Sequence, residues 1–264
     1  MSSTDDRWER GDPYERYIGR WSRRLAPHFL SWLDAPPHRR WLDVGCGTGA
    51  LTSAILERAN PATVSGVEPS DGFLTTAAHR LGARAQLHPG TAAQMPLPDA
   101  HAEVTVSGLV LNFTPDPAAA LAEMQRVTAP GGTVAAYVWD YAEGMQLIRC
   151  FWDAARALDE RAGTLDEAVR FPLCHRDALA ARFSEAGLQR VQTAALEIDT
   201  RFEDFDDYWL PFLGGQGPAP AYAMSLDDAG RSRLRDRLRA TLPVQAGGAI
   251  VLRARAWAVQ AQRA

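Results

Sequence analysis

Two patterns of hydrophobic residues, one typical of strands and one typical of helices, alternate along residues 41–139. Short apolar runs, typical of buried strands, are each followed by a stretch in which apolar residues recur every three or four positions, as on one face of a helix. The predicted strands are 41–44, 63–67, 85–88, 103–108 and 133–139. The predicted helices are 49–58, 70–81 and 116–127. Strands and helices that alternate in this way build βαβ units around a parallel sheet.

The second half of the chain contains both periods at wider intervals. Residues 145–160 and 176–186 have apolar residues at helical spacing. Residues 189–202 and 250–259 alternate apolar with polar side chains, which predicts two more strands. The segment between those strands indicates helices and loops. The turn Pro130-Gly131-Gly132 is expected to open the fifth strand at residue 133.

The first 37 residues differ from the rest of the chain. Apolar positions at helical spacing over 13–33 predict one or two amphipathic helices. Residues 1–12 are polar and acidic, and we expect them to form a mobile arm. Ala35-Pro36-Pro37 then interrupts the chain. The expected organisation is an N-terminal arm and helical lid at 1–37, then an α/β domain at 38–264 with helical insertions at about 141–172 and 203–247.

Composition narrows the class of protein. With 46% apolar and 23% charged residues, the chain is an ordinary globular protein and not a disordered one. No apolar run approaches the ~18 residues that a membrane span needs. The polar N-terminus is unlike a secretory signal, so a cytoplasmic location is expected. The cysteines at 46, 150 and 174 are too few and too far apart for a disulfide framework or a metal cluster, and we expect no metal.

The net charge of the chain argues against one further class, the proteins that bind nucleic acid over a broad surface. The net charge is −4, which argues against broad nucleic-acid binding, because such binding depends on basic residues that neutralise phosphates. Every one of the 28 basic residues is arginine, and alanine is abundant. This usage is typical of a GC-rich bacterial genome. We therefore expect neither a membrane nor a nucleic acid as partner, and we expect the protein to be either a monomer or a homodimer.

The strongest chemical signal is a glycine-rich turn after the first strand. Gly45, Gly47 and Gly49 stand where that strand should turn into a helix. Glycine allows positive φ and lets a ligand lie against the main chain. The free N–H groups and the dipole of the following helix favour an anionic group, either a phosphate or an amino-acid carboxylate.

An acidic residue completes this signal. Glu68 ends the second predicted strand, about twenty residues beyond the turn, where nucleotide-binding α/β folds place an acid on the ribose hydroxyls. Gly45-x-Gly47-x-x-Ala50 also satisfies the looser dinucleotide fingerprint, so a nicotinamide-dependent oxidoreductase is an alternative. Asp43 separates the two possibilities. Its charge would repel a pyrophosphate but would neutralise an ammonium group, as S-adenosylmethionine requires.

Longer motifs point to one family. LDVGCGTG at 42–49 and GVEPS at 66–70 resemble the first two motifs of the class I S-adenosylmethionine-dependent methyltransferases of small-molecule type. The resemblance continues through 92–113 and 120–140. It implies a doubly wound α/β fold whose seven-stranded sheet is mostly parallel with the last strand antiparallel. A helical N-terminal extension and helical insertions after strands five and six complete the expected fold.

The resemblance also assigns roles, residue by residue. It implies contacts of the S-adenosyl-L-methionine cofactor with Asp43, Gly45, Cys46, Gly47, Gly49, Glu68, Pro69, Ser70, Thr91, Ala92, Ser107 and Gly108. By this resemblance, Asp43 and the three glycines of the turn would hold the methionine moiety and Glu68 the ribose. Pro69 and Ser70 would flank the adenine. Thr91 stands where the family usually has an acid on the adenine amino group, so a hydroxyl or the Ala92 backbone serves there instead. Tyr17 and Trp21 are the expected lid, and Asn112 lies at the mouth of the site.

The sequence says least about the methyl acceptor. Methyl transfer is an in-line displacement that depends mainly on positioning, so an evident catalytic residue is not required. An oxygen, nitrogen or carbon atom of a small metabolite is the expected acceptor. Asp140, Tyr141 and His175 are the candidate bases, although capping and surface roles explain them equally well. A non-catalytic S-adenosylmethionine-binding protein is the remaining alternative.

Overall fold

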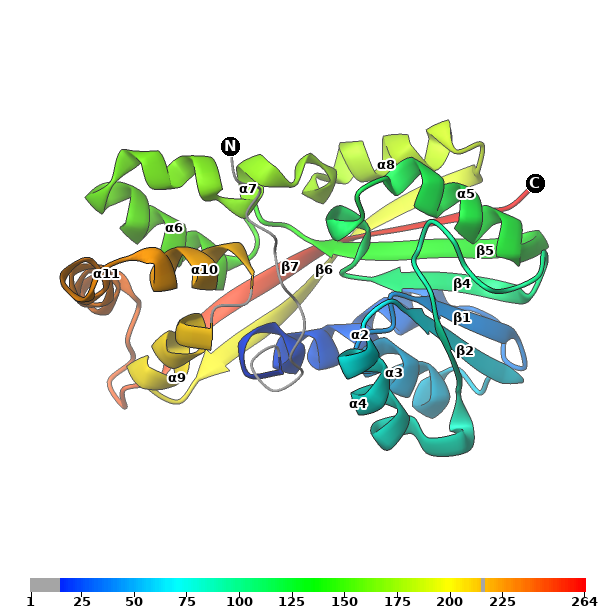
Figure 1. Ribbon diagram of the computed structural model, residues 1–264, viewed down its shortest axis with the longest axis horizontal. Coiled ribbons are helices and arrows are strands. Elements are labelled where there is room, and N and C mark those ends of the chain that lie inside the picture. Colours follow the sequence, from blue (N-terminus) through cyan, green and yellow to red (C-terminus); the bar gives the residue numbers. More distant parts are fainter. Residues whose placement is uncertain (1–14, 215–216) are drawn as a thin grey trace. The chain divides into compact units, whose positions relative to one another are not determined.

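The computed structural model describes residues 15–214 and 217–264 (Figure 1). The expected mobile arm at 1–12 lies outside them. Within the described residues there is one seven-stranded sheet with the order β3-β2-β1-β4-β5-β7-β6. Its strands are β1 (Arg40–Val44), β2 (Thr63–Glu68), β3 (Gln86–Pro89), β4 (Ala102–Gly108), β5 (Thr128–Trp139), β6 (Gln189–Phe202) and β7 (Ile250–Gln262). Strands β1 to β5 pair in parallel and β7 runs antiparallel to β5, so the predicted fold class is confirmed.

The helices also follow the predicted pattern. They are α2 (Arg20–Leu33), α3 (Ala50–Arg58), α4 (Asp71–Leu81), α5 (Pro117–Val127), α6 (Gln146–Leu158), α7 (Glu167–Arg170), α8 (Arg176–Glu185), α9 (Phe205–Trp209), α10 (Pro218–Ser225) and α11 (Asp228–Thr241). Shorter helical turns are η1 (Glu15–Gly19), η2 (Gly82–Arg84), η3 (Leu111–Phe113), η4 (Glu160–Leu165), η5 (Pro172–Cys174) and η6 (Leu210–Gly214). The helical pattern at 13–33 thus corresponds to η1 and α2.

Strand β5 corrects one prediction. It starts at Thr128 and not at residue 133, because the Pro-Gly-Gly segment bulges inside the strand without ending it. The pairing partner of Ala102 is Thr128, whereas that of Val104 is Thr133, so the register shifts across the bulge. The left-handed φ of Gly131, +73°, accommodates the bulge.

The chain forms two compact units. The sheet unit comprises Trp21–Trp139, Leu173–Leu196 and Ala256–Ala264. The helical unit comprises Met1–Arg20, Asp140–Pro172 and Glu197–Arg255. Strands β6 and β7 have residues in both. No helix in the described part of the chain is long and apolar enough to cross a membrane.

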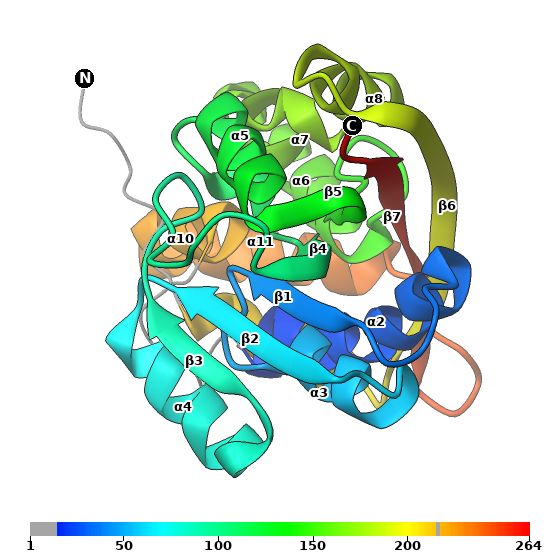
Figure 2. The ribbon, with the colours of Figure 1, turned by 90° about the vertical axis from the view of Figure 1, so that its right-hand side faces the viewer.

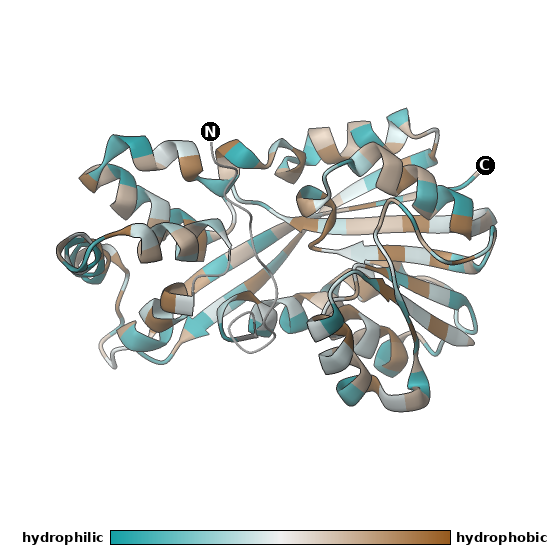
Figure 3. Ribbon diagram, in the orientation of Figure 1, coloured by the Kyte–Doolittle hydropathy of each residue, from teal (hydrophilic) through white to brown (hydrophobic). Residues whose placement is uncertain are grey.

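The sheet unit is layered. Helices α3 and α4 cover one face of its sheet, and α5 and α8 cover the other (Figure 2). The inner strands are strongly apolar (Figure 3), since parallel strands are buried on both faces. The carboxyl ends of β1, β2 and β4 lie at the same edge, which is where ligands bind in open α/β sheets.

The core of the helical unit is aromatic. The buried face of α6 provides Phe151 and Trp152. Phe151 stacks on Phe212 of η6 with ring centroids 4.6 Å apart, and Tyr208 of α9 lies 5.4 Å from Phe212. The Tyr208 hydroxyl donates to the carbonyl of Leu147 at 3.0 Å, which links α9 to α6.

Candidate functional site

The turn between β1 and α3 has three glycines with left-handed backbone. Their φ angles are +72° at Gly45, +53° at Gly47 and +84° at Gly49. A Cβ at Gly45 would lie 2.6 Å from the Val110 side chain, and one at Gly49 would lie 3.1 Å from Leu81. Gly47 is different, because nothing lies within 4 Å of its Cβ position. The turn is therefore packed at its ends and open in its middle.

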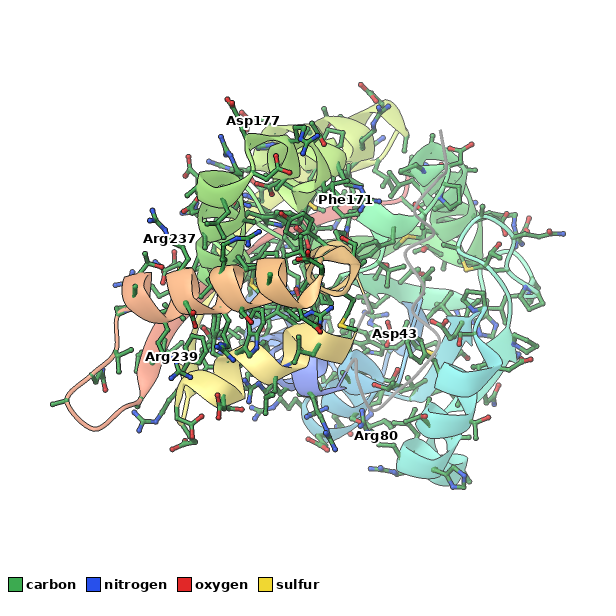
Figure 4. All side chains as sticks on the ribbon, turned by 60° about the vertical axis from the view of Figure 1, so that its left-hand side comes forward. Asp43, Arg80, Phe171, Asp177, Arg237 and Arg239 are labelled. Carbon is green, nitrogen blue, oxygen red and sulfur yellow. The ribbon has the colours of Figure 1, made fainter. Side chains whose placement is uncertain are left out.

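A neighbouring helix holds the turn in place. A guanidinium N–H of Arg80, on α4, donates to the carbonyl of Thr48 at 2.9 Å. Figure 4 labels Arg80, together with Asp43, which lies just before the turn. Backbone N–H groups of Gly45 and Cys46 both donate to the carbonyl of Val67 at the end of β2, at 2.8 and 3.1 Å. These contacts fix the turn without occupying the open face of Gly47.

The Glu68 carboxylate is directed at the glycine turn. Its Oε2 accepts from the backbone N–H of Gly47 at 3.1 Å, and its Oε1 accepts from that of Ser70 at 3.0 Å. The residue is only 7% exposed. Burial raises the pKa of Glu68, and the two backbone hydrogen bonds oppose this rise. Each carboxylate oxygen has a further lone pair with which it can accept a ligand hydroxyl.

Asp43 is a buried carboxyl group with one unsatisfied oxygen. Its Oδ2 accepts from the Thr52 hydroxyl at 2.6 Å. Its Oδ1 is buried and has no hydrogen-bond partner among the described residues. Burial raises the pKa of Asp43 to about 7, and the negative charge of Glu68 adds to the rise. This oxygen lacks a hydrogen-bond donor within the described chain, and a donor that carries a positive charge would also compensate the carboxylate.

Cys46 is not a nucleophile here. It is 5% exposed, and its Sγ lies 2.9 Å from the Cβ position of Gly66. Burial raises the pKa of the Cys46 thiol well above its usual value, and the charges of Asp43 and Glu68 raise it further. A thiol held in the neutral form is a packing group and a poor nucleophile.

The segment expected to contact adenine follows β2 and β3. Ser70 is the N-cap of α4, and its hydroxyl accepts from Phe73 N–H at 3.3 Å. The backbone N–H of Gly90 donates to the Glu68 carbonyl at 3.2 Å, which ties the end of β3 to the end of β2. In the turn after Gly90, Thr91 is exposed and Ala92 is buried.

The end of β4 lies beside the glycine turn. The Ser107 hydroxyl donates to the carbonyl of Val44 at 2.9 Å. A Cβ at Gly108 would lie 2.6 Å from the Tyr137 hydroxyl, so only glycine fits there. In the adjoining turn η3, Asn112 Nδ2 is buried and has no hydrogen-bond partner among the described residues.

The two residues predicted to form a lid belong to different units. Trp21 is 3% exposed on α2 in the sheet unit. Tyr17 belongs to the helical unit, where its ring packs edge-on against Phe212 with centroids 5.3 Å apart. Its hydroxyl is buried and has no hydrogen-bond partner among the described residues. A lid role for either residue stays a prediction.

The three candidate bases have very different surroundings. Asp140 is 2% exposed, and its Oδ2 forms an ion pair with Arg255 at 2.6 Å. Tyr141 is buried, with its ring centroid 6.0 Å from that of Phe171. His175 is exposed at the N-cap position of α8. A catalytic role for any of them stays a prediction.

The structure adds two residues that the sequence did not single out. Thr52 is the hydroxyl partner of Asp43, and its place in the first turns of the helix after the glycines was the available signal. Glu167 is a buried carboxyl group at the start of α7, only 2% exposed. An acid at the start of a helix is ordinarily an exposed residue that favours the helix dipole, so no pattern indicated its burial.

Comparisons with known proteins agree with this geometry. A family model described as a methyltransferase domain matches residues 42–136. A demethylmenaquinone methyltransferase of Geobacillus kaustophilus is 30% identical over 171 residues, which cover 58% of this chain and 72% of that protein. A malonyl-[acyl-carrier protein] O-methyltransferase of Serratia marcescens is 38% identical over 112 residues, covering 42% of this chain and 43% of that protein.

A solved structure shares the fold. It is described as a methyltransferase from an antibiotic biosynthesis pathway of Anabaena variabilis. The two chains superpose with a TM-score of 0.62 at 20% identity, over 89% of this chain and 96% of the other. At this level of identity the likeness establishes the fold alone.

Proposed function

Because the chain belongs to the class I S-adenosylmethionine-dependent methyltransferases, we propose that its glycine turn binds S-adenosyl-L-methionine and that the protein methylates a small-molecule metabolite. One observation carries the cofactor assignment. The buried Oδ1 of Asp43 has no hydrogen-bond partner in the described chain, and it lies immediately before an open, glycine-lined turn. An ammonium group at that place satisfies the oxygen and compensates the carboxylate charge.

The residues around the turn fit the rest of the cofactor. Glu68 accepts hydrogen bonds from the ribose hydroxyls with the lone pairs that Gly47 and Ser70 leave unused. We expect Ser107 and Gly108 to line the methionine chain, because they end β4 beside the glycine turn, where the Ser107 hydroxyl donates to the carbonyl of Val44. Pro69 and Ser70 flank the adenine.

Adenine recognition differs from that of the family. The exposed hydroxyl of Thr91 and the backbone of Ala92 replace the usual acid at the adenine amino group. A neutral acceptor gives a weaker hydrogen bond than a carboxylate, so Glu68 and Asp43 carry a larger share of the affinity.

The chemistry requires positioning more than acid–base groups. The cofactor supplies a methyl group on a positively charged sulfur, which leaves as a neutral thioether. The protein holds an oxygen, nitrogen or carbon atom of the acceptor in line with that methyl group, an effect worth up to ~7–11 kcal/mol. Asp140, Tyr141 and His175 are the proposed candidates for proton removal where the acceptor needs it.

Transfer is tested with a methyl-labelled cofactor. The protein is incubated with methyl-labelled S-adenosylmethionine and a bacterial metabolite extract, and labelled small molecules are identified by mass spectrometry. We expect at least one labelled product that is absent with the Asp43→Asn variant. A cofactor that stays intact with every extract, although it binds, contradicts methyl transfer and supports a non-catalytic binder.

The same preparation tests the oxidoreductase alternative. The Asp43 carboxyl group lies where a dinucleotide pyrophosphate would approach the turn, and its charge opposes that anion. We therefore expect no change in NADH fluorescence when protein is added. Tight NADH binding contradicts the assignment of the turn to S-adenosylmethionine.

A further inference from the structure

A second buried polar cluster lies in the helical unit, where no comparison assigns a role. It consists of Tyr17 of η1, Trp152 of α6 and Glu167 of α7, and we call it the Glu167 cluster. All three side chains are at most 4% exposed. They come from separate parts of the chain, so only the folded unit creates the cluster.

The Glu167 carboxylate is held by neutral donors. Trp152 Nε1–H donates to its Oε2, and the backbone N–H of Ala219 donates to its Oε1 at 3.3 Å. Within the described residues no arginine or histidine forms an ion pair with it. The adjacent Asp166, by contrast, pairs with Arg149 at 2.5 Å. A buried carboxylate without a cation is costly, because the interior solvates its charge poorly.

The electrostatics of the cluster agree with this geometry. Burial raises the pKa of Glu167 to about 7, and the charge of Asp166 adds to the rise. Burial and the Glu167 charge also raise the pKa of the Tyr17 hydroxyl well above its usual value. That hydroxyl is buried without a hydrogen-bond partner in the described chain. Within the described residues, the Tyr17 hydroxyl thus lacks a hydrogen-bond partner, and the Glu167 carboxylate, which affects the pKa of that hydroxyl, lacks a compensating cation.

Aromatic rings surround these polar groups. Tyr17 packs on Phe212, and Trp152 lies 5.4 Å from Tyr222, with the rings tilted. Tyr222 is incompletely buried on α10, so the ring cluster continues from Glu167 to the surface. Aromatic faces attract cations through the quadrupole of the ring, and the attraction grows when water is excluded.

The chemistry of the cluster selects among ligands. A carboxylate or a phosphate would meet the Glu167 charge with no cation to offset it. An alcohol could hydrogen-bond to Glu167 and Tyr17, but it would leave the charge uncompensated. An ammonium group suits the charge of Glu167, the unpartnered hydroxyl of Tyr17 and the aromatic rings. It donates hydrogen bonds to both oxygens, compensates the charge and is attracted to the ring faces.

We propose that the Glu167 cluster binds the ammonium group of a small amine with an apolar body.

The test compares amines with alcohols of the same carbon skeleton. Butylammonium and phenethylammonium, each beside its alcohol, are titrated by calorimetry into the full chain and into Glu167→Gln. The glutamine keeps an acceptor for Trp152 N–H and removes the charge. Glu160→Gln is the matched control, because Glu160 is exposed in the same unit and loses the same charge.

We expect the wild type and Glu160→Gln to bind at least one amine about tenfold or more tightly than its alcohol, and Glu167→Gln to lose this preference. Three results overturn the proposal: no amine binds in the millimolar range, an alcohol matches its amine, or the preference survives in folded Glu167→Gln. If Glu167→Gln fails to fold, the amine–alcohol comparison in the wild type decides. S-adenosylhomocysteine is titrated into the same samples, so loss of cofactor binding counts against the proposed function alone.

Discussion

Glycine serves different purposes within a single turn. At Gly45 and Gly49 the neighbours Val110 and Leu81 leave no room for a side chain. At Gly47 the space is open, although φ is again positive. A methyl group at Gly47 would therefore meet no described protein atom, and we expect it to meet the bound ligand instead. A substitution at Gly47 therefore tests ligand binding, whereas a substitution at Gly45 or Gly49 tests folding.

Gly47→Ala is predicted to weaken S-adenosylhomocysteine binding more than it lowers stability. The positive φ costs about 1 kcal/mol in stability, whereas the added methyl group excludes the ligand from the main chain. Gly131→Ala is the control, since Gly131 also has positive φ and an empty Cβ position but lies in the β5 bulge. Calorimetry and thermal melts of both variants check this. Equal losses of affinity in the two variants would contradict a ligand at Gly47.

The raised pKa of Asp43 predicts that the affinity for S-adenosylhomocysteine depends on pH. The free protein holds this carboxyl group at a pKa of about 7, and binding of an ammonium group requires its ionised form. Below pH 7 the group must release a proton on binding, so S-adenosylhomocysteine should bind about tenfold more weakly at pH 6 than at pH 8. Calorimetry at both pH values measures this ratio.

5′-Methylthioadenosine is the control for that ratio. It lacks the amino-acid group, so it reports any effect of the raised pKa of Glu68 without that of Asp43. The same pH dependence for both ligands would show that no ammonium group meets Asp43.

At the scale of elements, periodicity predicted the sheet, whereas the contacts of single side chains could not be predicted in this way. The order of strands and helices from β1 to β5 came from local patterns, because each apolar run is buried by its neighbours in the chain. The Glu68 contact with the turn followed from the end of β2 and the glycines. The bulge in β5 was missed, because a Pro-Gly-Gly segment ordinarily ends a strand.

Contacts between distant elements had no local signal. The ion pair of Asp140 with Arg255 joins the segment after β5 to β7, more than a hundred residues later. Nothing near Asp140 in the chain indicated that its charge is compensated in this way. The buried environment of Glu167 has the same origin, because Trp152 and Ala219 come from two other helices.

The ion pair between Asp140 and Arg255 predicts that two arginine substitutions in β7 lower the stability of the protein by different amounts. Arg255→Ala leaves the buried Asp140 carboxylate unpaired, and we expect it to lower the unfolding free energy by about 2–3 kcal/mol. Arg253→Ala is the control two residues earlier, where the side chain is 71% exposed and lies 3.9 Å from Glu197. That change should cost less than about 0.5 kcal/mol. Urea unfolding measures both, and equal values would show that the pair is not structural.

At the scale of the whole molecule, the family model and one of the buried carboxyl groups, Glu167, fall on different parts of the chain. The family model ends at residue 136, inside the sheet unit, and Glu167 lies outside it. The residues that match the family model thus lie in the sheet unit. Among the described residues, each unit holds one buried carboxyl group whose pKa is raised to about 7: Asp43 in the sheet unit and Glu167 in the helical unit.

These two groups predict how stability changes with pH. Both pKa values are higher in the folded than in the unfolded chain, so between about pH 5 and 7 the folded state binds more protons. Unfolding free energy should therefore fall as pH rises through that window, with each group contributing up to about 1.4 kcal/mol per pH unit. Urea unfolding at several pH values should show a shallower fall in Asp43→Asn and in Glu167→Gln. A stability that rises with pH over this window, or an unchanged slope in both variants, would contradict the burial of these charges.

The central claim is that one carboxylate, that of Glu68, holds the sugar of an S-adenosyl ligand beside the glycine turn. The most direct measurement is calorimetry of S-adenosylhomocysteine with the wild type, Glu68→Gln and the exposed control Glu57→Gln. We expect wild type and control to bind alike, and Glu68→Gln to lose about 1.5–3 kcal/mol of binding free energy. A wild type that does not bind the ligand, or a folded Glu68→Gln that binds it with undiminished affinity, would contradict the account.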